Sequence, residues 1–141
     1  MARTFNLVGP GVPRTLAPGA LCAQFAGKNR KKIKVGNLHP RRDFIDIRDA
    51  VSAYWKICEK GITGGTYNVC TGKTVSIRTL VQLFSRFAGG HRTIQKDSSR
   101  FRPGDLDRVC GDNTRLRRLG WTPLIPLEHS IRDMLGYAHS Q

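Results

Sequence analysis

Short strand-like runs alternate with helical patterns along this sequence, and glycine or proline residues separate most of them. Residues 3–8 form a strand-like run that stops at Gly9-Pro10-Gly11, residues 44–47 alternate as in a half-buried strand, and residues 66–70 follow Gly64-Gly65. This alternation predicts an α/β fold. A chain of 141 residues is long enough for one core and too short for two well-built ones, so we expect a single domain over residues 1–141.

Helices are predicted between these strands. The first covers residues 16–28, where Pro18 and Gly19 should force a late start. The second carries Asp49 in its first turn, a favourable place for a negative side chain, and ends at Gly61. Its apolar residues form one stripe, the pattern typical of a helix packed on a core. The stripe consists of Val51, Tyr54, Trp55 and Cys58.

Three further helices are predicted in the second half of the chain. Ser76 is a suitable N-cap for a helix that ends at Gly89-Gly90. Asp112 can cap a short helix that ends at Gly120, and Pro126 opens the last helix. Apolar residues recur at helical spacing in all three, namely Ile77, Leu80, Val81, Phe84 and Phe87, then Leu116 and Leu119, then Leu127, Ile131, Leu135 and Ala138.

The strands near Phe5 and Tyr67 have the character of interior sheet strands, which need neighbours on both sides. The sequence predicts too few other strands to supply those neighbours. We therefore expect that strands which pair with these two are missing from the chain.

The chain carries 24 Lys and Arg residues against 10 Asp and Glu residues, a formal net charge of +14 that attracts anions from a distance. We therefore expect an anionic partner. Charge alone leaves nucleic acid, acidic lipid and a nucleotide diphosphate open, because all three are rich in phosphate.

Hydropathy and cysteine usage indicate a cytoplasmic location. No apolar run approaches the length needed to cross a bilayer, and residues 1–8 meet Gly9 before the apolar part of a secretory signal could form. The cysteines are far apart and lack metal-ligand spacing, so we predict reduced, mostly buried thiols and no metal site. They are Cys22, Cys58, Cys70 and Cys110.

Two phosphate-binding motifs are incomplete in this sequence. Gly72-Lys73-Thr74 lies between a strand and a helix, as the end of a P-loop does, but Tyr67 stands where the first P-loop glycine is required. A plain turn into the helix is therefore favoured. Neither Gly9-Pro10-Gly11 nor residues 61–65 form the Gly-x-Gly-x-x-Gly turn of a dinucleotide site.

Two pairs of arginines are better candidates for binding phosphate. Arg41 and Arg42 immediately precede the strand at 43–47, and Arg100 and Arg102 form the second pair. Guanidinium groups bind a diphosphate through two-pronged, charge-assisted hydrogen bonds, each worth about 1.5–3 kcal/mol when shielded from water. A solvated surface position is the alternative for any single arginine.

The sequence contains, in this order, the blocks formed by residues 3–11, Val35-Gly36-Asn37-Leu38, residues 42–49, residues 67–72, Arg102-Pro103-Gly104-Asp105 and Gly120-Trp121-Thr122-Pro123. This series of blocks resembles the extended short-chain dehydrogenase/reductase family. Within it the blocks are similar to those of GDP-mannose 4,6-dehydratases and GDP-4-keto-6-deoxy-mannose reductases. The resemblance implies the α/β, C-terminal, substrate-binding part of such an enzyme, whose two interior strands would complete a Rossmann sheet.

The resemblance implies a nucleotide-sugar site, and its diphosphate-binding residues can be carried over one at a time. Arg42 and Arg102 match the two arginines that grip the diphosphate in the family. Asn6 matches an asparagine whose amide contacts the sugar nucleotide near the diphosphate. Two fixed cations for two phosphates agree with the chemistry of guanidinium groups.

The nucleoside-binding residues follow in the same way. Asp105 matches the position that reaches a ribose hydroxyl, and Val35 and Asn37 lie where the family packs and recognises the base. Residues 35–38 favour a GDP-sugar such as GDP-mannose or GDP-4-keto-6-deoxy-mannose, with a UDP- or dTDP-sugar epimerase or dehydratase as the alternative.

In the family, the first half of the enzyme supplies the glycine-rich turn, the catalytic Thr or Ser and the Tyr-Lys pair. This sequence has no tyrosine followed four positions later by lysine. The resemblance therefore implies a fragment without catalytic or cofactor-binding residues, NAD or NADP belonging to the intact enzyme. We expect no oxidoreductase turnover from this chain, and as partners a nucleotide sugar and the missing half.

Two hypotheses from other classes stay open. A basic nucleic-acid-binding module could use residues 28–34 with Arg115, Arg117 and Arg118, and its binding would fall steeply with salt. A non-catalytic interaction protein could self-associate through its exposed sheet edges and would be a dimer without ligand affinity.

Overall fold

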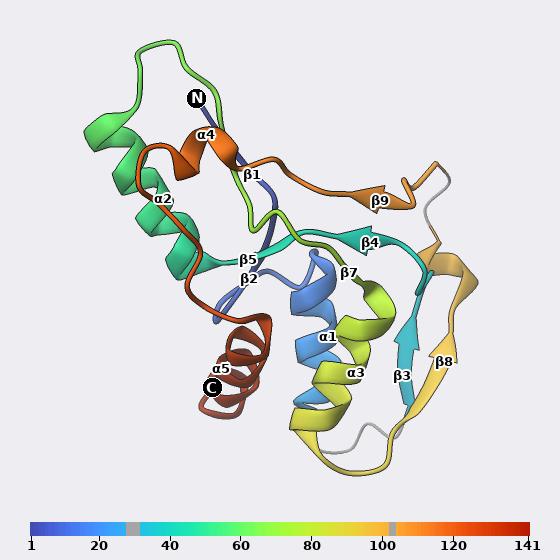
Figure 1. Ribbon diagram of the computed structural model, residues 1–141. Coiled ribbons are helices and arrows are strands. Elements are labelled where there is room, and N and C mark those ends of the chain that lie inside the picture. Colours follow the sequence, from blue (N-terminus) through green and yellow to red (C-terminus); the bar gives the residue numbers. More distant parts are fainter. Residues whose placement is uncertain (28–31, 102–103) are drawn as a thin grey trace.

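The computed structural model describes residues 1–27, 32–101 and 104–141, and it has the α/β architecture that the sequence predicts (Figure 1). In chain order the elements are β1 (Ala2–Thr4), β2 (Asn6–Val8), α1 (Ala17–Phe25), β3 (Lys32–Val35), β4 (Arg41–Arg42), β5 (Phe44–Asp46), α2 (Ile47–Lys60), β6 (Tyr67–Val69), β7 (Val75–Ser76), α3 (Ile77–Ala88), β8 (Thr93–Lys96), the 3-10 turn η1 (Ser98–Arg100), β9 (Arg108–Val109), α4 (Thr114–Arg117) and α5 (Leu127–His139).

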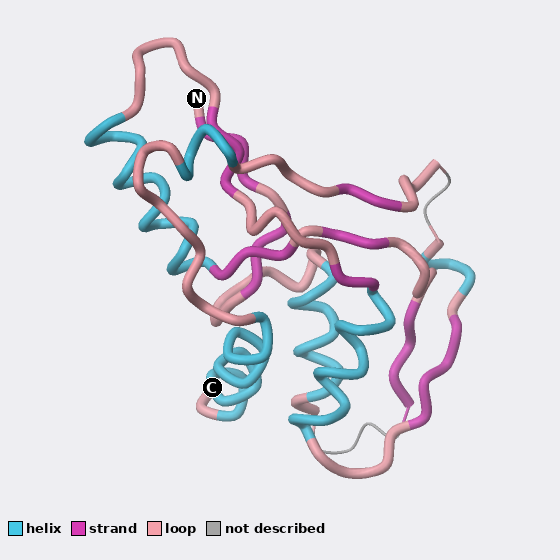
Figure 2. The backbone as a smooth tube through the Cα atoms, in the orientation of Figure 1, coloured by secondary structure: helices cyan, strands magenta, loops and turns pink. Residues whose placement is uncertain are grey.

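The strands form several small ladders rather than one broad sheet (Figure 2). The strand predicted at 3–8 is divided at Phe5 into β1, which pairs in parallel with β6, and β2, which pairs in parallel with β5. β3 pairs in parallel with β8. β4 lies between β7, which runs antiparallel to it, and β9, which runs parallel.

Helices α1, α3 and α5 pack side by side and form the larger core (Figure 1). Helix α3 shows why, since its buried residues Leu80, Val81 and Phe84 lie on one face and Phe84 stacks on Phe25 of α1 with ring centroids 5.7 Å apart. Its predicted N-cap is confirmed, because the Ser76 side chain accepts a hydrogen bond from the Thr79 N–H. The C-terminal helix begins after Pro126, as predicted.

A second, smaller core lies between α2, α4 and the β1–β6 pair. It is built from Ile45, Ala50, Ala53, Tyr67, Val69, Leu116 and Trp121. The described parts of the chain contain no helix with the length and hydropathy needed to cross a membrane.

The apolar stripe of α2 was predicted to pack on a core, but it is largely exposed. The prediction was wrong because the opposite face of the helix is buried. Val51 is 59% exposed and Trp55 is 67% exposed, whereas Ala50 and Ala53 are buried. The small alanine side chains let α2 lie close to β1, β2, β5 and β6. The large apolar side chains are left on the outer face of the helix.

Three smaller expectations also need correction. Helix α1 begins at Ala17, not late, because Pro18 sits in the first turn, where a helix does not need its missing N–H. Strand β5 is buried at every residue rather than on one face. Of the cysteines, which are all free, Cys58 and Cys110 are exposed and only the other two are buried.

Candidate functional site

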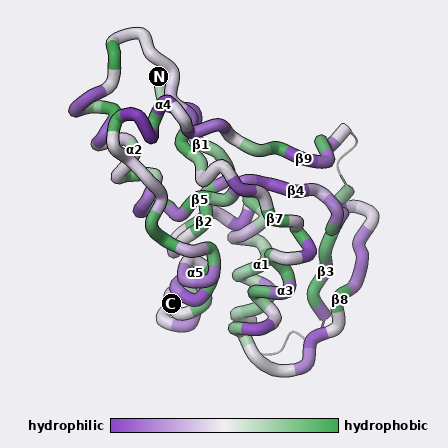
Figure 3. The backbone as a smooth tube through the Cα atoms, viewed as in Figure 1, coloured by the Kyte–Doolittle hydropathy of each residue, from purple (hydrophilic) through white to green (hydrophobic). Residues whose placement is uncertain are grey.

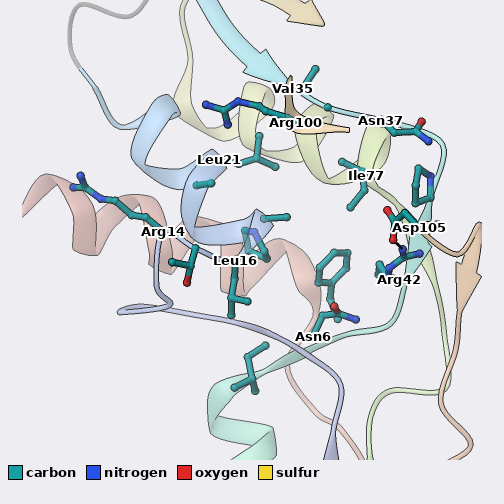
Figure 4. Close-up of a pocket in the computed structure, with 18 of the residues that line it drawn as sticks. Asn6, Arg14, Leu16, Leu21, Val35, Asn37, Arg42, Ile77, Arg100 and Asp105 are labelled. Atoms are coloured by element: carbon teal, nitrogen blue, oxygen red, sulfur yellow. Dashed lines mark hydrogen bonds and ion pairs between the residues drawn. The ribbon is translucent and has the colours of Figure 1, made fainter. Parts of the chain in front are cut away.

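A pocket of about 860 Å³ opens where α1, β3, β4 and β5 meet the segment that follows β8 (Figure 4). That volume suits a ligand of several rings. Residues from widely separated parts of the sequence line it, among them Asn6, Arg14, Leu16, Leu21, Gln24, Lys34, Val35, Asn37, Arg42, Phe44, Ile77, Arg100, Phe101, Asp105 and Val109.

Most of the site residues expected from the sequence line this single pocket. They are Asn6, Val35, Asn37, Arg42 and Asp105. Arg102 lies outside the residues that the structure describes, but its neighbour Arg100 is part of the lining. Each residue's role in binding a ligand remains a prediction.

Arg42 is held firmly at the edge of the pocket, its side chain only 14% exposed. Its Nη1 donates to the Leu106 carbonyl at 2.7 Å and to the Arg41 carbonyl at 2.9 Å, and its Nη2 pairs with the Asp105 carboxylate. These contacts fix the plane of the guanidinium group. The carboxylate of Asp105 therefore sits where an anionic ligand group would approach Arg42.

The orientation of Asn6 follows from its contact with Asp43, the residue immediately before β5. The backbone N–H of Asn6 and its Nδ2 both donate to the carbonyl of Asp43, at 3.2 and 3.0 Å. Because a carbonyl can only accept, the side-chain nitrogen must lie toward β5. The amide oxygen has no hydrogen bond within the described part of the chain.

The opposite wall is built on β3, whose position depends on Gln24 of α1. The Gln24 side chain accepts from the Lys34 N–H at 2.8 Å and donates to the Lys34 carbonyl at 3.1 Å, so it pairs with β3 as a neighbouring strand would. Val35 is buried, and Asn37 holds the following turn by accepting from the His39 N–H. Gln24 was not predicted as a site residue from the sequence. The signal was a polar residue among buried apolar positions of the predicted helix.

Two buried thiols near the core are poor candidates for nucleophiles. Burial, followed by the negative charge of Asp43, raises the pKa of Cys70 to about 12. Burial also raises the pKa of Cys22. Both are therefore protonated at neutral pH, and the thiolate is the reactive form.

The described residues do not fit NAD or NADP. A dinucleotide site needs a glycine-rich turn that joins a strand directly to a helix whose N-terminus faces the pyrophosphate. Gly9 and Gly11 follow β2, but α1 begins only at Ala17 and is preceded by an irregular segment.

The family model described as GDP-mannose 4,6 dehydratase matches residues 1–134. The chain belongs to this family. A relative, the GDP-6-deoxy-D-mannose reductase of Pseudomonas aeruginosa, is 34% identical to it over an alignment of 141 positions that covers 96% of this chain and 46% of the relative. The GDP-mannose 4,6-dehydratase of Sinorhizobium fredii is 30% identical and matches 71% of this chain and 33% of its own length.

Solved structures agree with this family assignment. The structure of RMD from Pseudomonas aeruginosa complexed with NADPH superposes with a TM-score of 0.91 at 33% identity, covering 99% of this chain and 48% of that one. The Thermus thermophilus UDP-glucose 4-epimerase complex with NAD has a TM-score of 0.83 at 22% identity, which supports the fold alone. The predicted fold class and family are thus confirmed. The chain spans less than half the length of these relatives.

Proposed function

We propose that residues 1–141 form the nucleotide-sugar-binding half of a GDP-sugar 4,6-dehydratase or 4-reductase, with GDP-mannose or GDP-4-keto-6-deoxy-mannose as ligand. The supporting observation is that Asn6, Arg42 and Asp105 line one pocket together with the apolar wall at Val35. A diphosphate needs fixed donors, a ribose needs an acceptor and a flat base needs an apolar surface.

Arg42 is the residue proposed to bind the diphosphate. Its guanidinium group is already oriented by the Leu106 and Arg41 carbonyls, so little freedom is lost when a ligand binds. A phosphate would compete with Asp105 for Nη2, and the carboxylate released from that ion pair could accept a ribose hydroxyl. Arg102 is proposed as the second cation, and Arg100 adds positive charge to the lining.

Calorimetric titration with GDP-mannose, GDP and UDP-glucose tests the proposal. We expect GDP-mannose and GDP to bind, and UDP-glucose to bind more weakly. Equal, weak heats for all three ligands would contradict the proposal. Tighter binding of UDP-glucose would favour the alternative of a UDP- or dTDP-sugar enzyme.

A pair of arginine substitutions sharpens this experiment. Arg42→Lys keeps the charge and loses the planar fork, so we expect binding to weaken about tenfold or more, since hydrogen bonds to charged groups are worth about 1.5–3 kcal/mol. Arg118→Lys is the matched control, because Arg118 is exposed and does not line the pocket. The Arg118→Lys variant should bind GDP-mannose with the same affinity as the unaltered chain.

We also propose that the open edge of β1 receives a parallel strand from the cofactor-binding half of the enzyme. The Met1 carbonyl and the Phe5 N–H bond to β6, so strand alternation directs the backbone groups of Ala2 and Thr4 to the other edge. Tyr54 of α2 bonds Thr4 at 2.6 Å, which brings the exposed outer face of α2 beside that edge. A separately produced cofactor-binding half should bind the chain. If the chain instead only self-associates with rising concentration, the partner at the β1 edge is a second copy of this chain.

On the same proposal, the chain alone has no dehydratase or reductase turnover. Purified chain supplied with GDP-mannose and either nicotinamide cofactor should leave the sugar unchanged. Detectable turnover would contradict this.

The nucleic-acid hypothesis gains no support from the fold. Lys32 and Lys34 of β3 lie far from Arg115 and Arg117 of α4, at opposite ends of the molecule (Figure 1). These residues, on which the hypothesis depends, therefore do not form one continuous surface for a phosphate backbone, and residues 28–31 lie outside the described part of the chain. Steeply salt-dependent binding of an oligonucleotide without nucleotide-sugar binding would reverse this ranking.

A further inference from the structure

Asp43 is a buried carboxylate, fully shielded from solvent, that the proposed function does not use. Its Oδ1 accepts from the Thr71 N–H at 2.9 Å and the Thr71 hydroxyl at 2.7 Å. Its Oδ2 accepts from the N–H groups of Gly72 at 2.9 Å and Gly111 at 3.3 Å. In the described part of the chain no Lys, Arg or His forms an ion pair with it.

Two glycines let separate loops close around this carboxylate. Gly72 has a positive φ of 79°, and at Gly111 a Cβ atom would overlap the Cys70 sulfur. The Gly72-Lys73 turn, which resembles the end of a P-loop, therefore does bind an anion, but the anion is the protein's own carboxylate. Asp43 thus fixes the loops that follow β6 and β9.

The backbone of the same residue contacts the pocket. The Asp43 N–H donates to the Val109 carbonyl at 3.1 Å, and its carbonyl accepts both N–H groups of Asn6. Asn6, Arg42 and Val109 line the pocket, whereas Asp43 and its carboxylate partners do not. The carboxylate can therefore influence a ligand through the position of these three residues without touching it.

We infer that Asp43 is a positioning residue that sets Asn6 and Arg42 in the geometry needed to bind a ligand diphosphate. A buried charge that is satisfied only by backbone N–H groups and one hydroxyl demands that every donor stay in place, because each missing donor leaves the charge under-solvated. The inference concerns the same site as the proposed function and rests on it for the identity of the ligand.

Asp43→Asn tests the inference. The substituted amide has the same shape, but its NH2 group must face an N–H donor, which pushes at least one loop away. We expect GDP-mannose to bind at least about tenfold more weakly to the folded variant. Unchanged affinity would overturn the inference.

Asp49→Asn is the matched control. Asp49 is also a buried carboxylate, and it accepts from the N–H groups of Leu124 and Ile125, but none of these residues lines the pocket. A merely structural role predicts that both variants lose stability and keep the affinity of their folded fraction. A positioning role predicts weaker binding in Asp43→Asn alone.

A readout without ligand separates this inference from the proposed function. In nitrogen-15 NMR spectra the Asn6 side-chain amide and the Arg42 Nε–H should shift in Asp43→Asn and stay in place in Asp49→Asn. If the unaltered chain binds no nucleotide sugar, the proposed function fails, and these signals still decide whether Asp43 positions the two residues. Unshifted signals in Asp43→Asn would overturn the inference.

A milder variant covers the case in which Asp43→Asn does not fold. Thr71→Val removes the hydroxyl donor to Oδ1, together with the longer contacts of that hydroxyl with the Lys73 backbone at 3.2 Å, and keeps the Thr71 N–H donor. Binding should weaken roughly threefold, as expected for one neutral hydrogen bond, and the Asn6 amide signal should shift in the same direction. No change in either measurement would contradict the inference.

Discussion

The two walls of the pocket are held in place by different kinds of contact. On one side, the segment that runs from β4 to the start of α2 carries three buried carboxylates, Asp43, Asp46 and Asp49, and each one binds a separate segment of the chain. On the other side, β3 is paired with β8, which is exposed at every residue and mostly hydrophilic (Figure 3). A displacement of the first wall would leave buried charges unsatisfied, whereas a displacement of the second would mainly break a backbone ladder.

This difference agrees with the task proposed for each wall. The diphosphate is common to all nucleotide sugars, and the wall that bears Arg42 has the contacts that are most costly to disturb. The base varies among nucleotide sugars, and the wall that bears Val35 depends on the neutral amide of Gln24. We therefore expect substitutions on the two walls to differ in their cost to stability.

The largest loss of unfolding free energy is expected from Asp46→Ala. Asp46 caps α2 by accepting from the Arg48 N–H, accepts again from the Arg48 side chain, and accepts from the Ser130 hydroxyl of α5 at 2.6 Å. Removing the carboxylate deletes the cap and leaves the buried hydroxyl with only a long contact of 3.5 Å to the Pro126 carbonyl, so the free energy of unfolding should fall by about 3 kcal/mol. Denaturant unfolding followed by circular dichroism measures this change.

Asp133→Ala is the control for that experiment. Asp133 also pairs with Arg48, at 2.8 Å, but both side chains are more than 40% exposed. An exposed ion pair contributes at most about 1 kcal/mol, so this variant should unfold almost like the unaltered chain. Equal losses for the two variants would mean that burial of the carboxylate does not distinguish the first wall.

A smaller loss of unfolding free energy is expected from Gln24→Leu on the second wall. The leucine fills a similar volume but leaves the Lys34 N–H and carbonyl without their side-chain partner, which should cost about 2 kcal/mol. Gln82→Leu, at an exposed position of α3, should change stability by less than about 0.5 kcal/mol. If Gln24→Leu were as stable as that control, the proposed support of β3 by α1 would be wrong.

Acid should weaken the contacts that Asp46 makes in the first wall. Burial alone would raise the pKa of Asp46, but hydrogen bonds from Arg48 and Ser130 outweigh it and hold the pKa below its ordinary value of 3.8. A carboxyl whose pKa is lowered by folding adds stability above its unfolded pKa, and that stability is lost as pH falls through the lower, folded value. Unfolding free energy should therefore decrease as pH drops below about 4.

The variant Asp46→Ala isolates this contribution. The pKa values of Asp97 and Asp112 are also lowered, by hydrogen bonds from Ser99 and Thr114, and both residues remain in the variant. The variant should consequently lose less stability on acidification than the unaltered chain. Parallel pH profiles for the two proteins would show that Asp46 is not responsible.

Some features that depend on contacts between residues close in the sequence were predicted correctly, whereas some that depend on contacts between distant residues were not. Helix α3 was predicted from local signals, because its cap lies at Ser76 and its buried face repeats at helical spacing. The outer face of α2 was not, since Val51 and Trp55 have the pattern of a core helix, and only the tertiary contacts of Ala50 and Ala53 decide which side is buried. Local periodicity reports an amphipathic helix without naming its partner.

The site shows the same division. Arg42, Asn6 and Asp105 were named through family resemblance, and one pocket holds all three. Asp43 stands beside Arg42 in the sequence, yet nothing local indicates that its carboxylate binds loops 28 and 68 positions away. Contacts of that range depend on the whole fold, so sequence patterns around the residue could not reveal them.

The smallest effect is expected from Gln95→Ala on β8, and it bears most directly on the comparison. Gln95 faces Lys34 in the β3–β8 register and is exposed, so the substitution removes no buried contact and keeps the backbone ladder. The change in unfolding free energy should stay within about 0.5 kcal/mol. Hydrogen exchange at the Ile33 and Val35 amides offers a second, local measure, and both should keep the protection they have in the unaltered chain. A loss above about 1 kcal/mol would mean that β8 anchors the pocket through its side chains. The second wall would then be as firmly held as the first, and the contrast between buried carboxylates and an exposed strand would no longer explain the site.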